Sequence, residues 1–276
     1  MSISRKITEG AGSGGGSGET YVDDVFSTDV FDTELEVSNT ITNGIDLAGE
    51  GGMIWLKTRD TPGDSTLHDS ERGLEYGIYT TGTDPHYDFV DLGFTKPIFS
   101  SDGYTTSTAR VYSKDGKAVG WTFRKARSFF DVVTYTGDGV DRTVPHNLGS
   151  VPGMIIVKRT DASGTWPVWH TSISTGTIAR LLLNESTEAQ NSSTIFTSTP
   201  PTSSGFTVGT SSDTNSLNGE YVAYVFAHDD SDEGLIQCGS FVPADTWGSV
   251  IDLGWEPQFL MIKNADGSGE IGRAHV

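Results

Sequence analysis

The sequence predicts an all-β fold built from tandem β-sandwich domains of the jelly-roll or concanavalin-like type. Short runs rich in valine, isoleucine, threonine and aromatic residues alternate with clusters of glycine, proline, asparagine, aspartate and serine, which is the pattern of strands and turns. The apolar spacing of amphipathic helices is nearly absent. A block of about 100 residues also recurs along the chain, and this is the size of a small domain.

The first 20 residues are predicted to be a flexible N-terminal segment. Residues 10–18 contain only glycine, serine and alanine, a composition that behaves as a random-coil tether. Gly10, Gly12 and Gly15 form a G-x-G-x-x-G string. A dinucleotide site needs a strand before these glycines and a helix after them, and the sequence predicts neither. We therefore interpret the string as part of the tether.

One strand recurs three times, and each copy ends in a lysine. The copies are Met53–Lys57, Met154–Lys158 and Phe259–Lys263, and their lysines are 101 and 105 residues apart. Several landmarks at one spacing indicate repeated domains. The further landmarks are Gly103-Tyr104-Thr105 with Gly205-Phe206-Thr207, Trp121-Thr122-Phe123 with Tyr224-Val225-Phe226, Leu67-His68 with Trp169-His170, and Thr134-Tyr135 with Ser240-Phe241.

These landmarks divide the chain into a sandwich repeat at residues 21–126, a second at 129–229, and the truncated start of a third at 234–269. A repeat of ~100 residues is long enough to bury a core of its own. We therefore expect separate sandwiches strung end to end, each folded around its own interior. Residues 270–276 read as the translation of a short-read sequencing adapter, and we expect this heptapeptide to be an artefact.

The segment at residues 178–190 fits two structures. Ile178, Leu181 and Leu182 would share one face of a helix. The alternative is a strand at residues 179–184 followed by a loop. We favour the strand because the apolar run is short and no capping residue precedes it.

Composition and charge exclude several classes of protein. The chain carries 37 acidic and 18 basic side chains, for a formal net charge of -19. This charge repels phosphate backbones and anionic lipid, so we expect no nucleic-acid binding. No apolar run approaches the ~20 residues that cross a bilayer, so we expect no membrane insertion. No signal peptide is visible at the N-terminus.

Cys238 is the single cysteine, which excludes a disulfide within the chain. It lies in residues 234–239, which read as a strand. A small buried apolar residue is the favoured interpretation, and a reactive thiol is the alternative.

The sequence contains no motif for catalysis. H-E-x-x-H, C-x-x-C, P-loop and G-x-S-x-G strings are absent. Glu71 and Glu75 are closely spaced and would share one face of a strand, as a glycosidase pair requires. A solvated loop is the favoured interpretation of this stretch. We expect no enzyme activity and no cofactor.

Trp166, Trp169 and His170 are the candidate ligand-binding residues, because they form the richest aromatic group outside the repeated strands. An exposed tryptophan can stack on a sugar ring, whereas a buried one cannot, and we favour burial. The acidic run after the second repeat supplies weak calcium candidates. These are Asp229, Asp230, Asp232 and Glu233.

Four strings resemble the tandem β-domains of tailed-phage structural proteins, a family frequent among marine viruses. They are YVDDVFS at residues 21–27, GWTFRKA at 120–126, FFDVVTYTG at 129–137 and HNLGSVPGMIIVK at 146–158. The resemblance covers about residues 20–269. It implies a virion protein of the tail-fibre or decoration type, assembled in the host cytoplasm. The family has no established catalytic residues, so none are transferred.

Two functions follow as expectations. The first is a non-catalytic virion structural protein that contacts other virion proteins and contributes to host attachment. The alternative is a lectin-like module that binds cell-surface glycans through exposed aromatic residues. A homo-oligomer is compatible with both, although no heptad or trimer seam is visible in the sequence.

Overall fold

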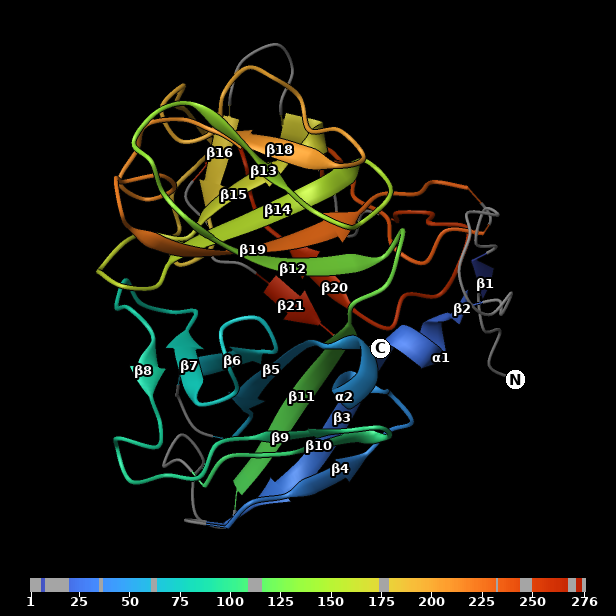
Figure 1. The fold of residues 1–276 in the computed structure, drawn as a ribbon. Coiled ribbons are helices and arrows are strands. Elements are labelled where there is room, and N and C mark those ends of the chain that lie inside the picture. The colour runs from blue at the N-terminus through green and yellow to red at the C-terminus, as the bar shows by residue number, and fades with distance from the viewer. Residues whose placement is uncertain are drawn as a thin grey trace.

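The structure, a computed structural model, describes residues 6–7, 20–34, 37–60, 64–108, 116–173, 179–231, 233–243, 250–267 and 272–274. Its regular structure is almost entirely antiparallel β-sheet, which confirms the predicted all-β sandwich fold. Two large sheets face each other, and a small sheet lies on the outer side of each (Figure 1). The described helices are single turns, namely α1 (Val22–Val25), α2 (Leu47–Glu50) and the 3-10 turn η1 (Thr171–Ile173).

The first large sheet has the strand order β3–β11–β5–β6–β7–β8. Its strands are β3 (Phe26–Thr33), β5 (Gly52–Thr58), β6 (Ser65–Asp69), β7 (Tyr76–Tyr79), β8 (Tyr87–Asp88) and β11 (Gly116–Arg124). The small sheet on its outer side has the order β4–β10–β9. It consists of β4 (Thr40–Thr42), β9 (Ile98–Ser100) and β10 (Gly103–Thr105).

The second large sheet has the order β12–β19–β14–β15–β16–β17. Its strands are β12 (Phe130–Thr136), β14 (Pro152–Arg159), β15 (Pro167–His170), β16 (Ala179–Leu182), β17 (Gln190–Asn191) and β19 (Glu220–Ala227). The small sheet on its outer side pairs β13 (Arg142–Pro145) with β18 (Gly205–Val208). The strand β16 confirms the preference for a strand over a helix in this segment.

The two large sheets repeat one topology. The strands that carry the recurring Met-to-Lys sequence, β5 and β14, are both third in their sheets. One neighbour carries the aromatic landmark, β11 or β19, and the other neighbour is β6 or β15. The repeat found in the sequence is therefore also a repeat of strand order.

One predicted landmark pair is wrong by a single residue. Trp55 pairs with Leu67, and its counterpart Ile156 pairs with Val168. Leu67 therefore corresponds to Val168 rather than to Trp169. A shift of one residue turns a strand's side chains to the opposite face, so this correction decides which side chains share an environment. The corrected pairs are Leu67 with Val168, His68 with Trp169, and Asp69 with His170.

Side chains alternate along β5 between two cores. Ile54 and Leu56 point to the small sheet and belong to a core within the first repeat. Met53 and Trp55 point to the other large sheet. On β14, residues 155 and 157 likewise belong to a core within the second repeat, whereas Ile156 joins the core that contains Trp55.

This third core, the shared core, joins the two sandwiches. It contains side chains of both large sheets, including Trp55, Trp121 and Phe123 from the first and Trp166, Tyr224 and Phe226 from the second. The Phe123 and Phe226 rings lie 5.7 Å apart between centroids. The expectation that each sandwich folds around its own interior alone is therefore wrong. Each of the first two repeats also has a core of its own, between its large sheet and its small sheet, which we call its private core. The inner faces of the two large sheets are buried against each other in the shared core.

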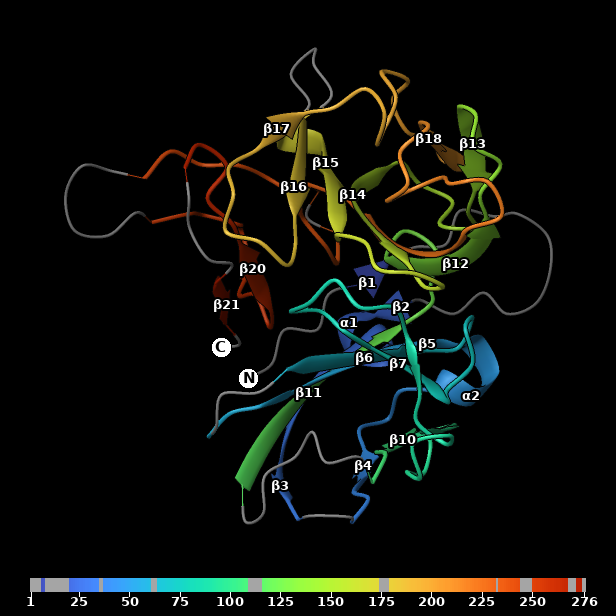
Figure 2. The same cartoon turned by 90° about the vertical axis from the view of Figure 1, so that its left-hand side faces the viewer.

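The third copy of the repeated strand is present in β20 (Leu260–Ile262), which pairs with β21 (Gly272–Ala274). Leu260 pairs with Ala274 across the same sequence separation as Ile155 with Trp169, so β21 takes the place that β15 has in the second repeat. The two strands lie at one side of the gap between the large sheets (Figure 2).

The strand predicted at residues 234–239 is absent, because the described backbone there has no regular structure. The physical reason is that a strand in this position would have no neighbouring strand to pair with. Its counterpart β12 is an edge strand that hydrogen-bonds only to β19, and no described segment supplies a third copy of β19. A strand without a partner leaves its backbone groups unpaired.

Predictions for the chain ends fall mostly outside the described residues. Residues 8–19 of the predicted tether are not among them, and β1 (Lys6–Ile7) pairs with β2 (Thr20–Tyr21). Within the predicted artefact, residues 270, 271, 275 and 276 also lie outside the described part. Among the described residues, no helix is long and apolar enough to span a membrane.

Candidate functional site

A groove of about 1300 Å³ lies between the two large sheets. It lies where the shared core reaches the edge occupied by the third repeat. The groove is mainly apolar, as ligand sites and protein interfaces are. Its walls include Phe26 and Phe123 from the first sheet, Met154 and Phe226 from the second, and Phe259 and Met261 from the start of the third repeat.

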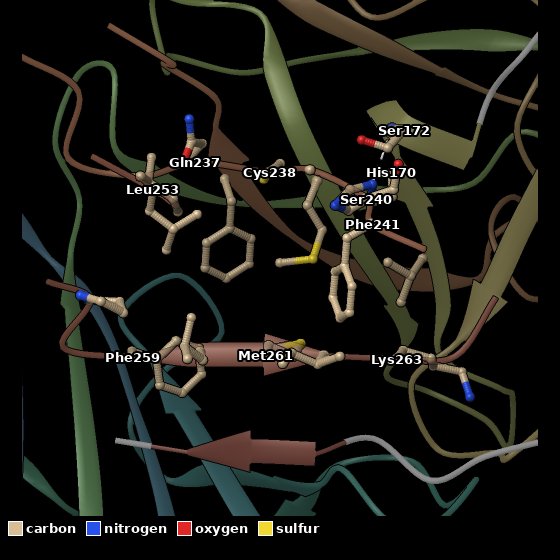
Figure 3. A pocket seen from close by; sticks show the side chains of 18 of the residues that line it. His170, Ser172, Gln237, Cys238, Ser240, Phe241, Leu253, Phe259, Met261 and Lys263 are labelled. Atoms are coloured by element: carbon tan, nitrogen blue, oxygen red, sulfur yellow. Dashed lines mark hydrogen bonds between the residues drawn. The ribbon is translucent and has the colours of Figure 1, made fainter. Parts of the chain in front are cut away.

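The strand that crosses the groove fills part of it. Phe259 packs against three aromatic rings of the first repeat, with centroid distances of 5.6 Å to Trp121, 5.7 Å to Phe123 and 6.0 Å to Phe26. Met261 follows on the same strand, and the loop that carries Gln237 to Phe241 lies on the other side of the cavity (Figure 3). The groove is therefore a seat for the chain's own third repeat.

A few polar groups lie at or beside the groove, on the second repeat and on the start of the third. His170 Nδ1 accepts a hydrogen bond from the Ser172 amide at 3.2 Å. Burial lowers the pKa of His170, and nearby His228 lowers it further. His228 Nδ1 accepts a bond from the Cys238 amide at 3.1 Å. Burial raises the pKa of the Cys238 thiol to about 12, so this cysteine is a poor nucleophile at neutral pH.

The predicted ligand-binding residues do not form one exposed patch. Trp166 is fully buried in the shared core, where its Nε1 donates to the Gly82 carbonyl at 3.2 Å. Trp169 is 9% exposed and lies in the private core of the second repeat. Only His170 lines the groove. The two indoles therefore pack on opposite faces of the second large sheet, which is incompatible with a joint sugar-stacking surface.

The structure describes three of the four acidic candidates, Asp229, Asp230 and Glu233. Asp229 accepts a hydrogen bond from the Ser231 amide at 2.9 Å. Asp232 lies outside the described residues. The part of the chain that the structure describes holds no group of three or more histidine, cysteine, aspartate or glutamate residues placed to bind a metal.

Glu71 and Glu75 lie in a turn region rather than on a strand. Glu71 pairs with Lys125 at 2.7 Å and Glu75 with Lys96 at 3.4 Å. Both pairs are partly exposed, and such pairs add little stability. The loop interpretation is therefore confirmed for this stretch.

A buried polar network crosses the shared core. Arg72 Nε donates to Asp69 Oδ2 at 2.6 Å, and the Arg72 amide donates to Asp69 Oδ1 at 2.9 Å. The Tyr224 hydroxyl of the second repeat donates to Asp69 Oδ2 at 2.8 Å. The ion pair is almost fully buried, with side-chain exposures of 3% for Arg72 and 0% for Asp69. A buried ion pair needs such additional bonds to offset its desolvation.

His68, beside this network, is kept neutral. Burial lowers its pKa to about 3, and the Arg72 charge acts in the same direction. Its Nδ1 lies 3.1 Å from the Leu74 carbonyl oxygen, and only a protonated Nδ1 can donate to a carbonyl. The neighbouring ring of Phe89 meets it edge to face at 5.0 Å. These contacts describe a packed histidine of the first repeat.

Lys158, the repeated lysine of the second copy, also bridges the repeats. Its fully buried side chain donates to the Thr83 carbonyl at 2.9 Å and to the Gly164 carbonyl at 2.8 Å. Burial lowers its pKa to about 8. The Trp166 ring lies under the Nζ atom at 5.8 Å. The lysine thus reaches from the second repeat into a loop of the first.

Sequence reasoning did not identify this network or the groove. The sequence does contain one indication of the network, which is a polar position at which the two copies of the repeat differ. Asp69 of the first copy corresponds to His170 of the second, and a polar residue that changes between copies marks a contact that the repeats do not share. The off-by-one match of Leu67-His68 obscured this correspondence.

Fold and site together define an all-β protein of stacked β-sandwich repeats whose buried polar groups join one repeat to the next. The chain belongs to the family described as Domain of unknown function (DUF7483), which matches residues 23–271. Neither a search of curated proteins nor a search of solved structures gave a match.

Proposed function

We propose that this protein is a non-catalytic virion structural protein of the tail-fibre or decoration type that contributes to host attachment. The observation that carries the proposal is the shared core, in which the two sandwiches bury the inner faces of their large sheets against each other. A fibre or decoration protein has to hold its domains at fixed positions, and an interface with a large apolar core resists relative domain motion. The resemblance of four sequence strings to tailed-phage structural proteins supplies the virion context.

The chemistry of the buried groups supports a structural role. Asp69, Arg72 and Tyr224 bond to one another, and Lys158 bonds to backbone carbonyls. A catalytic acid or base has to reach a substrate atom within hydrogen-bond distance. These groups lie inside the contact between the two sheets, where their bonds serve the packing of one repeat on the next.

The lectin-like alternative is less well supported. It relied on Trp166 and Trp169, and both indoles are buried. A glycan site on this protein would have to use other side chains. We therefore retain host attachment as a property of the assembled particle, through contacts with other virion proteins and with host glycan.

The direct test is the protein content of purified particles. A tailed phage that encodes this chain is purified by density gradient, and its particles are digested and analysed by quantitative mass spectrometry. We expect peptides from the chain at a fixed copy number relative to the major capsid protein. Peptides that occur in infected cells but never in particles would overturn the proposal.

A glycan array with the full chain separates the two candidate functions. Specific binding that survives a Trp166→Phe substitution would add glycan recognition through other residues. No binding above background would leave the structural role alone.

A further inference from the structure

The contact between the first and second repeats is partly reproduced between the second and the third. The His86 amide, just before β8, donates to the Thr160 carbonyl at 3.1 Å, and the Ala189 amide, just before β17, donates to the Ala265 carbonyl at 2.8 Å. Thr160 and Ala265 each stand two residues after the repeated lysine. Equivalent backbone atoms therefore form the same hydrogen bond at both junctions.

The repeated lysines make a second equivalent contact. Lys158 Nζ donates to the Thr83 carbonyl of the first repeat at 2.9 Å. Lys263 Nζ donates to the Glu185 carbonyl of the second repeat at 2.8 Å. Thr83 lies between β7 and β8, and Glu185 lies between β16 and β17, the corresponding strands. Each lysine thus reaches into the same loop of the preceding repeat.

The inward-facing positions of the repeated strand agree in all three copies. Met53 and Trp55 of the first copy face the shared core, as do Met154 and Ile156 of the second. Phe259 and Met261 occupy these positions in the third copy and pack against the same core. The start of the third repeat is therefore oriented as the two complete repeats are.

The third copy also touches the first. Phe259 packs on Trp121 and Phe123 of the first repeat, while Lys263 bonds to the second repeat. In an open stack each repeat contacts only its sequence neighbours. Contact with both other repeats is the property of a closed arrangement around one axis.

The opposite face of the third strand is not covered as its counterparts are. Leu56 and Val157 are 2% and 0% exposed because each faces the private core of its sandwich. Ile262 takes the same position in the third copy and is 43% exposed. The third copy of the repeated strand therefore packs against the shared core on one face, while Ile262 on its other face is not covered by a private core.

We propose that the groove is the seat of the large sheet of a third sandwich of the same repeat, which residues 234–267 begin. Three sandwiches then close in a ring around the shared core, related by a pseudo-threefold axis. This inference rests on the repeated contacts and does not depend on the virion function proposed above. The groove is thus occupied by a third copy of the repeat in the same chain, and not by a separate molecule.

The proposal can be tested by completing the third repeat with strands copied from the second repeat. Because Lys263 corresponds to Lys158, a chimera joins residues 1–263 to a second copy of residues 159–229. A second chimera joins residues 1–267 to residues 163–229, which keeps the native turn after the lysine. We expect a higher Tm than that of the unmodified chain and weaker fluorescence of a dye that binds exposed apolar surface.

Ile262→Ala is the discriminating variant. In the unmodified chain, where Ile262 is 43% exposed, the substitution should lower Tm by less than about 2 °C. In a chimera that forms a third private core, the same substitution should lower Tm by about 5–10 °C. Phe259→Ala is the matched control, because it removes a ring from the shared core and should lower Tm in both backgrounds.

Four outcomes would overturn the proposal. One is an Ile262→Ala effect that stays small in both chimeras while Phe259→Ala lowers their Tm. Another is proteolytic removal of the added residues without a change in Tm. The third is misfolding of both chimeras. Concentration-dependent dimers of the unmodified chain that dissociate on Phe259→Ala would instead assign the groove to a second copy, which also contradicts the proposal.

Discussion

The Tyr224 hydroxyl donates a hydrogen bond to Asp69 Oδ2 at 2.8 Å, and the two residues belong to different repeats. Both side chains are buried, and Arg72 holds the same carboxylate oxygen at 2.6 Å. A hydrogen bond to a charged group is directional and stabilises more than a neutral one. This bond therefore helps to set how the second large sheet sits on the first.

Removal of this bond should destabilise the protein. We expect Tyr224→Phe to lower the free energy of unfolding by about 1.5–3 kcal/mol, the range for a hydrogen bond to a charged group. Equilibrium unfolding in urea measures it. A double-mutant cycle with Asp69→Asn should show a coupling energy of at least ~0.5 kcal/mol.

Tyr135→Phe is the control for this cycle. The Tyr135 hydroxyl donates to the Thr214 carbonyl within the second repeat at 2.7 Å. Its coupling to Asp69→Asn should be near zero. Equal coupling energies for the two tyrosines would contradict the proposed role of Tyr224 at the repeat interface.

The lowered pKa of His68 predicts that the folded protein loses stability in acid. Its pKa is about 3 in the folded protein and about 6.5 in an unfolded chain. Between these values the unfolded state binds a proton that the folded state does not, so stability falls as the pH is lowered from 6.5 toward 3. The slope from this group approaches about 1.4 kcal/mol per pH unit.

Urea unfolding at a series of pH values from 7 to 4 measures this slope. His68→Gln keeps a donor for the Leu74 carbonyl but does not titrate, so its curve should be flatter than that of the unsubstituted protein. The other histidines with lowered pKa values contribute equally to both curves. Parallel curves would show that His68 is not the residue responsible.

Trp166 should behave as a core residue. Trp166→Phe removes the donor to the Gly82 carbonyl and leaves space in the shared core, so we expect a loss of about 1–3 kcal/mol in unfolding free energy. Trp255→Phe, at a half-buried position, should cost less. Equal stabilities for the two variants would show that the Trp166 indole is not packed as described.

Cys238 should react slowly in the folded protein. Burial raises its pKa to about 12, and its Sγ lies 3.6 Å from the Ala227 carbonyl oxygen. At pH 8 we expect alkylation by iodoacetamide to be much slower in the native chain than in urea, because only the thiolate reacts. As the chain has one cysteine, mass spectrometry reports this site alone. Native labelling at the rate found in urea would contradict the raised pKa of this half-buried thiol.

The sequence predicted much of the fold because strand patterns and repeats are local signals. The recurring Met-to-Lys strand marked β5 and β14, and both hold the same place in their sheets. The short apolar run at Leu181 was correctly assigned to a strand. Such features depend on residues close together in the chain, where side-chain periodicity carries the information.

The shared core and the site were not predictable in the same way. The inward and outward faces of β5 are equally apolar, so the sequence does not distinguish a private core from a shared one. The bond between Asp69 and Tyr224 joins residues 155 positions apart, and no local pattern indicates it. The strand expected around Cys238 failed because strand formation needs a partner that lies elsewhere in the fold.

Native-state hydrogen exchange of the full chain tests the central claim, that two sandwiches unfold as one body around a shared core. Backbone amides of β5 and β14 would be followed at increasing urea concentrations. We predict that both sets converge on one unfolding free energy, that of global unfolding, because neither large sheet can expose its inner face alone. If the amides of β5 and the amides of β14 instead converged on two different unfolding free energies, the shared core would be contradicted. The two sandwiches would then be independent domains.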